Sequence, residues 1–256
     1  MPLNISGNVV NSDIVKTFSY KNIITRGLYL HLDAGAPESY PGSGTVWYDM
    51  SGNARNFNIV AGAYNSSGPQ YMDFNGSYGM AKNAADFPSF SDANGVTYVV
   101  WTRVKNASAD WRTLTRAYTS GAGNHHVIIQ LGGWNIGMYD NTNTSGFNST
   151  GYSQQSLPNY GTSNWICMYF RWQTVSPYYE FSYNDTPGTI RGSLTSANAR
   201  HQIGFGSIGG YNAESTDPTV GSQFWGDIST FMVYNRRLTD TELLQIYNVQ
   251  KARFGL

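Results

Sequence analysis

The sequence predicts an all-β protein, an antiparallel sandwich or barrel that ends in one short helix. Charged residues make up only 12% of the 256 residues, whereas glycine (28) and tyrosine (19) are abundant. This balance favours turns and strands over long solvated helices. Short apolar runs recur along the chain between Gly, Asn, Ser or Pro. About ten such strands with closely spaced turn signals indicate a sandwich or barrel rather than βαβ units.

The first strand is predicted at residues 28–33, where Leu28, Leu30 and Leu32 alternate with less apolar positions. A loop rich in Pro and Gly follows at 34–44, and Ser-Gly-Asn within 48–53 supports a tight turn. Further strands are predicted within residues 57–60, 70–76, 95–104, 112–118, 125–132, 134–140, 164–172, 177–184, 200–207 and 227–235.

Two of these runs, 95–104 and 164–172, are apolar on both faces, so we expect them to be central strands of their sheets. Near the end, Thr239 and Glu242 match a capping box, and an apolar stripe at helical spacing follows. This pattern predicts a short amphipathic C-terminal helix.

Residues 1–26 are polar, lack a long periodicity and precede the first strand. We expect them to form an N-terminal arm that attaches a single domain, residues 27–256, to a partner. The arm shows neither a signal-peptide pattern nor a span of apolar residues long enough for a membrane helix. Sixteen basic and sixteen acidic residues cancel, which argues against nucleic-acid or membrane partners. The one cysteine, Cys167, lies in an apolar run, so we expect a buried side chain rather than a reactive thiol.

A family resemblance rests on the two ends of the chain. The opening "GLYLHLDAG…YPGSGTVWYDMSGN" and the closing "FWGDISTFMVYNRRLTDTELLQIYN" resemble laminin-G-like domains of the concanavalin A-like lectin/glucanase superfamily. The resemblance covers roughly residues 27–250 and implies an antiparallel jelly-roll β-sandwich. The segment "FSYND" at 181–185 departs from the family pattern.

Within that superfamily, "YPGSG" and the terminal "RFGL" look like domains of tailed-bacteriophage structural proteins. The resemblance implies a virion protein, assembled in the host cytoplasm and displayed on capsid, tail or fibre in several copies or as a homo-oligomer. Its partners would be other virion proteins, such as the major capsid protein or tail proteins, contacted through the arm. The alternative is an adhesion module that binds host or environmental glycans, and the two functions are compatible.

The sequence carries no familiar catalytic set. Glycosidases of this superfamily commonly use Glu-x-Asp-x-x-Glu on one strand, because hydrolysis needs two carboxyl groups at a fixed separation. That pattern is absent, and the acidic pair Glu214 and Asp217 lies in an expected loop. The sequence therefore predicts a protein that is not an enzyme. It predicts no cofactor, and calcium is the one candidate.

Candidate ligand-binding residues lie around the predicted strand 134–140. A sugar site needs an aromatic face with hydroxyl-binding groups nearby, which favours Tyr139, Asp140 and Asn141, with Trp111 as a further contributor. Asp73 and Asp140 are the candidate calcium ligands, since calcium prefers loop oxygens. The alternative interpretation is that these aromatic residues fill the core and that these acidic residues stabilise turns.

The residues most typical of the family also have a structural interpretation. Asp49 and Asn53 can satisfy loop amides, and Asn235 and Arg236 can tie the last strand to the helix through backbone groups. We expect these residues to hold the fold together.

Overall fold

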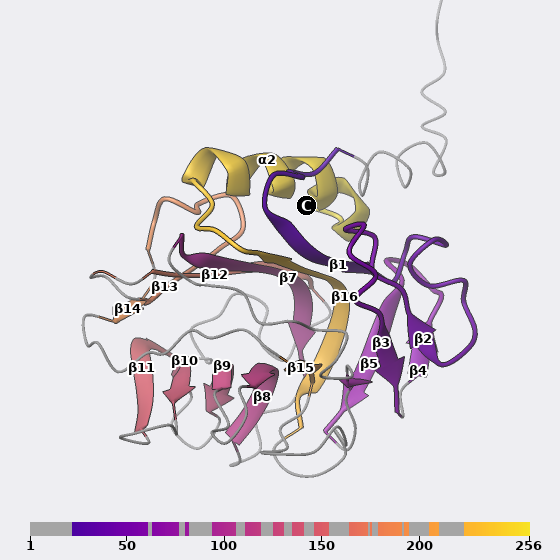
Figure 1. Ribbon diagram of the computed structural model, residues 1–256, viewed down its shortest axis with the longest axis horizontal. Helices are drawn as coiled ribbons and strands as arrows, with labels where there is room; N and C mark the ends of the chain where they lie inside the picture. Colours follow the sequence, from indigo (N-terminus) through magenta and orange to yellow (C-terminus); the bar gives the residue numbers. More distant parts are fainter. Residues whose placement is uncertain are drawn as a thin grey trace, which may run out of the picture.

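Two antiparallel sheets lie face to face, and the C-terminal helix covers the outer face of one of them (Figure 1). We call the covered one the helix-side sheet and the other the distal sheet. The computed structural model describes residues 22–60, 63–76, 80–81, 94–105, 111–118, 125–130, 135–140, 146–153, 164–173, 175, 179–190, 192–194, 205–209 and 223–256.

In the described part of the chain, each sheet contains eight strands. The helix-side sheet runs in the order β14 (Gly192–Leu194), β13 (Tyr179–Tyr183), β12 (Ile166–Trp172), β7 (Val96–Val104), β16 (Trp225–Tyr234), β5 (Tyr71–Asn75) and β4 (Ala63–Asn65), with β1 (Leu28–Asp33) also paired to β16. The distal sheet runs in the order β11 (Gly146–Ser153), β10 (Asn135–Asp140), β9 (His125–Gln130), β8 (Trp111–Tyr118), β15 (Phe205–Ile208), β6 (Met80–Ala81), β3 (Phe57–Ile59) and β2 (Val46–Trp47). The helix α2 spans Asp240–Gln250, and the 3-10 helix η3 spans Lys251–Phe254.

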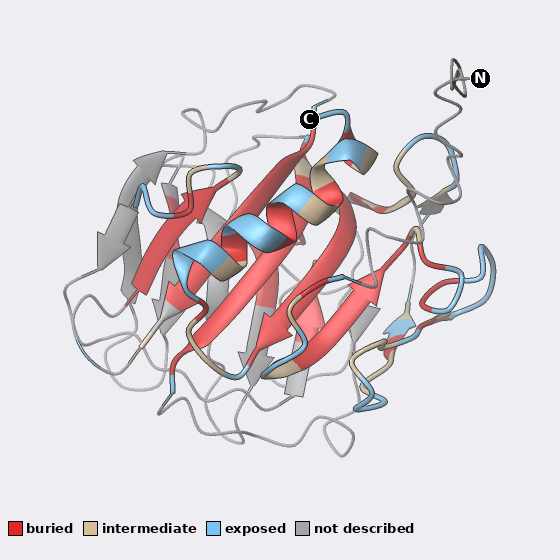
Figure 2. Cartoon of the chain, turned by 90° about the horizontal axis from the view of Figure 1, so that it is seen from above, coloured by how far each residue is buried: buried red, intermediate tan, exposed pale blue. Residues whose placement is uncertain are grey.

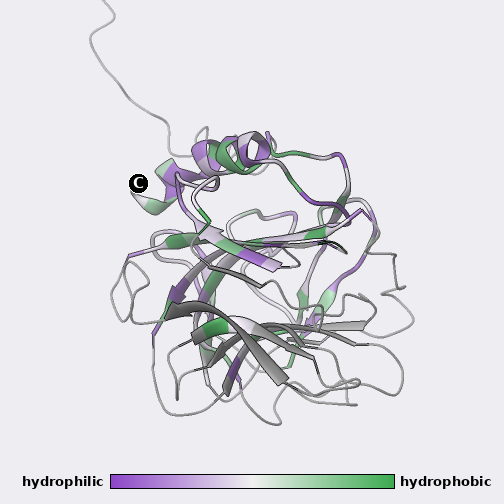
Figure 3. Cartoon of the chain, turned by 90° about the vertical axis from the view of Figure 1, so that its left-hand side faces the viewer, coloured by the Kyte–Doolittle hydropathy of each residue, from purple (hydrophilic) through white to green (hydrophobic). Residues whose placement is uncertain are grey.

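The all-β sandwich with one short C-terminal helix is confirmed. The two runs that are apolar on both faces form β7 and β12, and both are interior strands as predicted. They are buried on both sides because one face meets the distal sheet and the other meets α2. The stacked layers are visible side-on in Figure 3.

The main core lies between the two sheets. It joins side chains such as Val100, Phe170 and Phe231 of the helix-side sheet to Leu114 and Ile208 of the distal sheet. All five are at most 1% exposed. The alternation of apolar residues along the strands supplies this layer, because successive side chains point to opposite faces.

A second cluster lies between the helix-side sheet and α2, and Figure 2 shows the exposed outer side of the helix above buried strands. Leu243 and Ile246 of α2 pack here, together with Trp101 of β7 and Tyr169 of β12. Cys167 is also fully buried in this cluster, which confirms its expected structural role. Burial raises the pKa of its thiol far above the ordinary value, so the neutral form predominates.

Several strands of the structure were not predicted from the sequence. The largest is β11, whose sequence GFNSTGYS is polar and small, so it carries no apolar alternation. It forms because its backbone pairs along β10 from Asp140 to Asn135. The shorter β2, β4, β6 and β14 have at most three residues each, too few to show a period.

Residues 22–26, assigned by the sequence analysis to the arm, contact the domain. Ile23 is 8% exposed and packs in the cluster beneath α2. The Tyr234 hydroxyl donates to the carbonyl of Ile24 at 2.9 Å, and Arg236 Nε donates to the carbonyl of Arg26 at 2.9 Å. The rest of the predicted arm lies outside the described residues. Within the described part of the chain, no helix has the length and apolarity required to cross a membrane.

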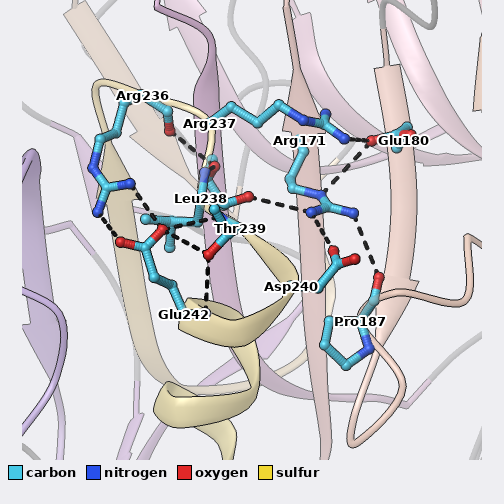
Figure 4. A network of polar contacts seen from close by, with 10 residues as sticks. Arg171, Glu180, Pro187, Arg236, Arg237, Leu238, Thr239, Asp240 and Glu242 are labelled. Carbon is cyan, nitrogen blue, oxygen red and sulfur yellow. Dashed lines mark hydrogen bonds and ion pairs between the residues drawn. The ribbon is translucent and has the colours of Figure 1, made fainter.

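The start of α2 has the predicted capping box. The Glu242 peptide N–H donates to Thr239 Oγ1 at 3.3 Å, and the Thr239 peptide N–H donates to Glu242 Oε2 at 2.9 Å. Arg236 extends the box, since its two terminal nitrogens donate to the two Glu242 carboxylate oxygens at 2.9 and 2.6 Å (Figure 4). Asn235 donates its peptide N–H to the carbonyl of Gly27 at 2.9 Å. These contacts support the expected structural role of the Arg236 side chain, whereas the Asn235 contact is made by its backbone.

A second arginine, the buried Arg171, also contacts the start of α2. Arg171 of β12 is 4% exposed, and its Nη1 donates to Asp240 Oδ1 at 2.6 Å and to the Leu238 carbonyl at 3.2 Å. Its Nη2 donates to the Pro187 carbonyl at 3.4 Å, and Glu180 of β13 lies 3.7 Å from its Nε. Figure 4 shows this arginine with its contacts to Asp240, Pro187 and Glu180. The network therefore positions α2 on the sheet rather than forming an open site.

Replacing Glu242 with glutamine is expected to cost about 1 kcal/mol at pH 7. The hydrogen bond from Arg236, the largest cause, holds the pKa of Glu242 at about 2, below its ordinary 4.5. Because the folded-state pKa is depressed, the stabilisation is complete above pH 4.5 and is lost as the pH falls towards 2. Urea unfolding of wild type and Glu242→Gln at both pH values checks this. An equal difference in stability at pH 7 and pH 2 would contradict it.

Candidate functional site

A pocket of about 460 Å³ opens beside β1, between the segment that precedes this strand and the loops that follow β1 and β2. Four segments of the chain build it, and each contributes one or two side chains. Its apolar wall consists of Ile23, Leu28 and Met50, and its polar groups belong to Thr25, His31, Glu38 and Asp49.

Asp49 holds the loop that forms one wall. One carboxylate oxygen accepts from the peptide N–H groups of His31 and Ser51, both at 2.9 Å. The other accepts from Ser51 Oγ at 2.7 Å and from the Arg55 peptide N–H at 3.0 Å. Asn53 adds hydrogen bonds from its amide to backbone carbonyls of β1, at 3.2 and 3.3 Å. The expected role of Asp49 in satisfying loop amides is borne out by these contacts, and its acceptors are fully used. Asn53 instead donates to carbonyls of the neighbouring strand.

His31 lines the same pocket from the middle of β1. Its backbone joins the loop on both sides, since its N–H donates to Asp49 and its carbonyl accepts from the Met50 N–H at 2.8 Å. Its side chain is 2% exposed, and Nε2 has no hydrogen-bond partner. Burial lowers the pKa of His31 to about 4, against smaller opposing effects of Asp33 and Asp49. At neutral pH the pocket therefore contains an uncharged imidazole.

Acidification from pH 6.5 to about 4 is expected to destabilise the protein through His31. The unfolded chain binds a proton in this range that the folded chain does not, so the contribution is on the order of 2 kcal/mol. His31→Asn should lose less stability than wild type over the same interval. Unfolding free energies at pH 7, 5 and 4 test this. Parallel pH profiles for the two proteins would show that His31 does not cause the acid sensitivity.

The predicted sugar-binding residues are distributed over the distal sheet. Strand pairing places Trp111 at the start of β8 level with Asn135 at the start of β10. Tyr139 and Asp140 lie at the other end of β10, so Asp140 is about 17 Å from that level at 3.4 Å per residue. Asn141 and the side chains of the other three lie outside the described part. The backbone therefore does not bring Trp111 to the same strand end as Tyr139 and Asp140, and their sugar contacts stay a prediction.

The candidate calcium ligand Asp73 has a cationic neighbour. Its carboxylate lies 3.1 Å from Lys105 Nζ, which also contacts the buried Asp227 at 2.5 Å. Among the described residues, no group of three or more His, Cys, Asp or Glu side chains is placed to hold a metal ion. The side chain of Asp140 is outside this set, as are Glu214 and Asp217. Calcium binding therefore stays a prediction.

No protein-family model matches the chain, and no curated protein sequence matches it. Solved structures do match in fold. A Trypanosoma rangeli sialidase in complex with sialic acid has a TM-score of 0.59 and 13% identity, over 89% of this chain and 33% of that one. Domain 4 of AbnA, a GH43 extracellular arabinanase from Geobacillus stearothermophilus in complex with arabinotriose, has a TM-score of 0.59 and 16% identity, over 86% of this chain and 98% of that one. The receptor-binding domain of a botulinum neurotoxin C/D mosaic serotype has a TM-score of 0.60 and 12% identity, over 89% and 52%.

What these proteins share with the chain is a lectin-like β-sandwich. The chain spans about a third of the sialidases and nearly all of the arabinanase domain. At such low identity the likeness is one of fold, and fold does not determine function. The expected sandwich is thereby confirmed. None of the three solved structures described above is of a bacteriophage protein.

The prediction that the chain is not an enzyme is wrong and is corrected by these comparisons. It rested on the absence of a Glu-x-Asp-x-x-Glu pattern and on an all-β sandwich with no familiar catalytic set. Sialidase chains contain the same fold. The missing pattern therefore does not exclude catalysis in a protein that contains this sandwich.

Three features of the pocket were not found from the sequence. The alternation of β1 predicts which residues share a face, but not that His31 is buried without a partner for Nε2. Glu38 and Thr25 lie in ordinary loop sequence and become neighbours only through the fold. The signal that the sequence did carry was the polar turn at residues 48–53, which forms the adjoining wall.

Proposed function

We propose that the chain is a glycan-binding module. The observation that carries this is the match to the arabinanase domain, a unit of nearly the same extent whose structure contains arabinotriose. Carbohydrate recognition by a sandwich of this kind needs a concave surface with apolar and hydrogen-bonding groups. The pocket beside β1 supplies both, and its volume of about 460 Å³ lies in the usual range for small-ligand sites.

An array of neutral and acidic glycans, probed with the purified full-length chain, tests this function. We expect saturable binding of at least one glycan, to be verified in solution by calorimetry. Parallel measurements with added calcium and with chelator examine the predicted calcium dependence. Release of free sugar from the bound glycans is assayed in the same samples, because this fold also occurs in sialidase chains. If no glycan binds saturably, either with added calcium or with chelator, the proposal is overturned.

The proposed carrier of this module is the virion of a tailed bacteriophage. The support is the resemblance of the chain's two ends to structural proteins of such phages, with residues 1–26 as the proposed attachment segment. A mass-spectrometric inventory of purified particles should contain the chain in several copies. Deletion of residues 1–21, which leaves the contacts of Ile23 and Ile24 in place, should abolish incorporation. Undiminished incorporation would contradict attachment through this segment.

A further inference from the structure

We propose that the pocket beside β1 is a saccharide site that selects uncharged saccharides over acidic ones. This inference rests on the proposed glycan-binding function and assigns it a place and a ligand class. The place is distinct from the candidate residues of the distal sheet, Trp111 and Tyr139 to Asn141. The support comes from the polar groups of the pocket and from the charges around it.

The first support is the unsatisfied imidazole. His31 is 2% exposed and Nε2 lacks a partner, although buried polar atoms are nearly always hydrogen-bonded. A ligand hydroxyl within the pocket would supply that missing partner. An uncharged imidazole suits a hydroxyl well, because a hydroxyl can both donate and accept a hydrogen bond and so can pair with Nε2 in either tautomer.

The second support is the arrangement of the remaining polar groups. Asp49 uses both carboxylate oxygens for the loop and holds the wall in place. The exposed Glu38 carboxylate and the exposed Thr25 hydroxyl are the other polar side chains of the lining. Leu28 and Met50 provide apolar surface in the same lining. Apolar walls with a few convergent polar groups are typical of small-ligand sites.

The third support is the charge of the lining. Two carboxylates line the pocket, and none of its described lining residues is a lysine or arginine. The nearby Arg55 lies 3.7 Å over the ring of Tyr29 and donates to its carbonyl. Arg253 is paired with the buried Asp33. A sialic or uronic acid carboxylate would therefore meet two carboxylates and no cation among the described lining residues, whereas a neutral sugar would not be repelled.

Thr25→Trp is designed to fill the pocket from an exposed position. The glycan array, printed with neutral glycans and with glycans that contain sialic or uronic acid, is the probe. We expect wild type to bind neutral glycans, and Thr25→Trp to bind the best of them at least about tenfold more weakly. Thr241→Trp, which adds the same side chain to an exposed position of α2, should bind within about twofold of wild type.

Glu38→Gln tests the negative charge of the pocket lining without changing the shape of the side chain. It removes one negative charge but keeps a hydrogen-bonding side chain, so the ratio of acidic to neutral glycan binding should rise by about fivefold. Asp185→Asn, the same kind of change at an exposed position outside the pocket lining, should leave the ratio unchanged. Thermal unfolding of every variant verifies that the domain is folded.

Each outcome decides one statement. Unchanged glycan binding by folded Thr25→Trp overturns the pocket as the site and leaves the glycan-binding function standing. Preference of wild type for acidic glycans overturns the selectivity. Absence of binding by wild type to every printed glycan overturns the function itself, and this inference with it.

Discussion

Arg253→Met is expected to destabilise the protein by about 3–5 kcal/mol, because it leaves a buried carboxylate without its cation. Arg253 Nη1 lies 2.6 and 2.8 Å from the two carboxylate oxygens of Asp33. The side chains are 4% and 0% exposed, so water cannot replace the arginine. Arg253 Nη2 also donates to Ser229 Oγ at 2.6 Å and to the Gln70 carbonyl at 3.3 Å. One residue near the C-terminus thus joins β1, β16 and the segment before β5.

Urea unfolding at pH 7 measures this loss, with Arg26→Met as the matched control. Arg26 has an exposed side chain, so its replacement should change the unfolding free energy by less than about 0.5 kcal/mol. The double variant Asp33→Asn with Arg253→Met should recover part of the loss, since no uncompensated charge remains. A loss below about 1 kcal/mol in the single variant would show that the pair contributes little.

Gly35 is required beside this ion pair. A Cβ atom built at Gly35 would lie 2.3 Å from Arg253 Nη2, closer than real contacts allow. Any side chain there would push the guanidinium away from Asp33. The glycine of the sequence "DAGAP" therefore has a packing reason that its place in an expected loop does not reveal.

The sequence predicts those parts of the fold that depend on neighbouring residues. The alternation of Leu28, Leu30 and Leu32 predicts β1, and the spacing of Thr239 and Glu242 predicts the start of α2. In each case the signal lies within a few residues, because a strand or a helix turn is a local structure. Central strands such as β7 are also predictable, since burial on both faces requires a continuous apolar run.

The parts that escape prediction depend on distant residues. Asp33 and Arg253 are separated by 220 positions, and no local pattern connects them. The polar strand β11 is fixed by its pairing to β10 rather than by its own composition. The pocket beside β1 is unpredictable for the same reason, because its walls come from four separate segments. The polar turn predicts Asp49 as a residue that holds the loop, but no sequence pattern places His31 beside it.

Trp101→Ala is expected to cost about 3–5 kcal/mol, because it leaves a cavity beneath the C-terminal helix. Trp101 is fully buried on β7, with its ring stacked on Phe254 at 3.9 Å and on Tyr247 at 5.8 Å between centroids. Its indole Nε1 donates to Gln250 Oε1 at 2.6 Å. Gln250 is itself completely buried, so the substitution also leaves its side-chain oxygen without this donor.

Chemical denaturation measures the total loss of stability in Trp101→Ala. Trp101→Phe separates the contribution of the hydrogen bond from that of the cavity. The phenyl ring keeps most of the stacking but cannot donate to Gln250, so its cost should be about 1–3 kcal/mol. Tyr48→Ala, which removes an aromatic ring that is 43% exposed, should stay within about 0.5 kcal/mol of wild type. An equal loss for Trp101→Ala and Trp101→Phe would assign the effect to the hydrogen bond rather than to the cavity.

Amide hydrogen exchange shows which part of α2 is destabilised by Trp101→Ala. The tryptophan contacts α2 and η3 through their last turns, whereas the Arg171 and Arg236 contacts hold the first turn of α2. Trp101→Ala should therefore accelerate amide exchange most around Tyr247 and Gln250 and least around Glu242. Uniform acceleration over the whole of α2 would mean that the helix detaches as a unit, and the polar contacts at its start would then be too weak to hold it alone.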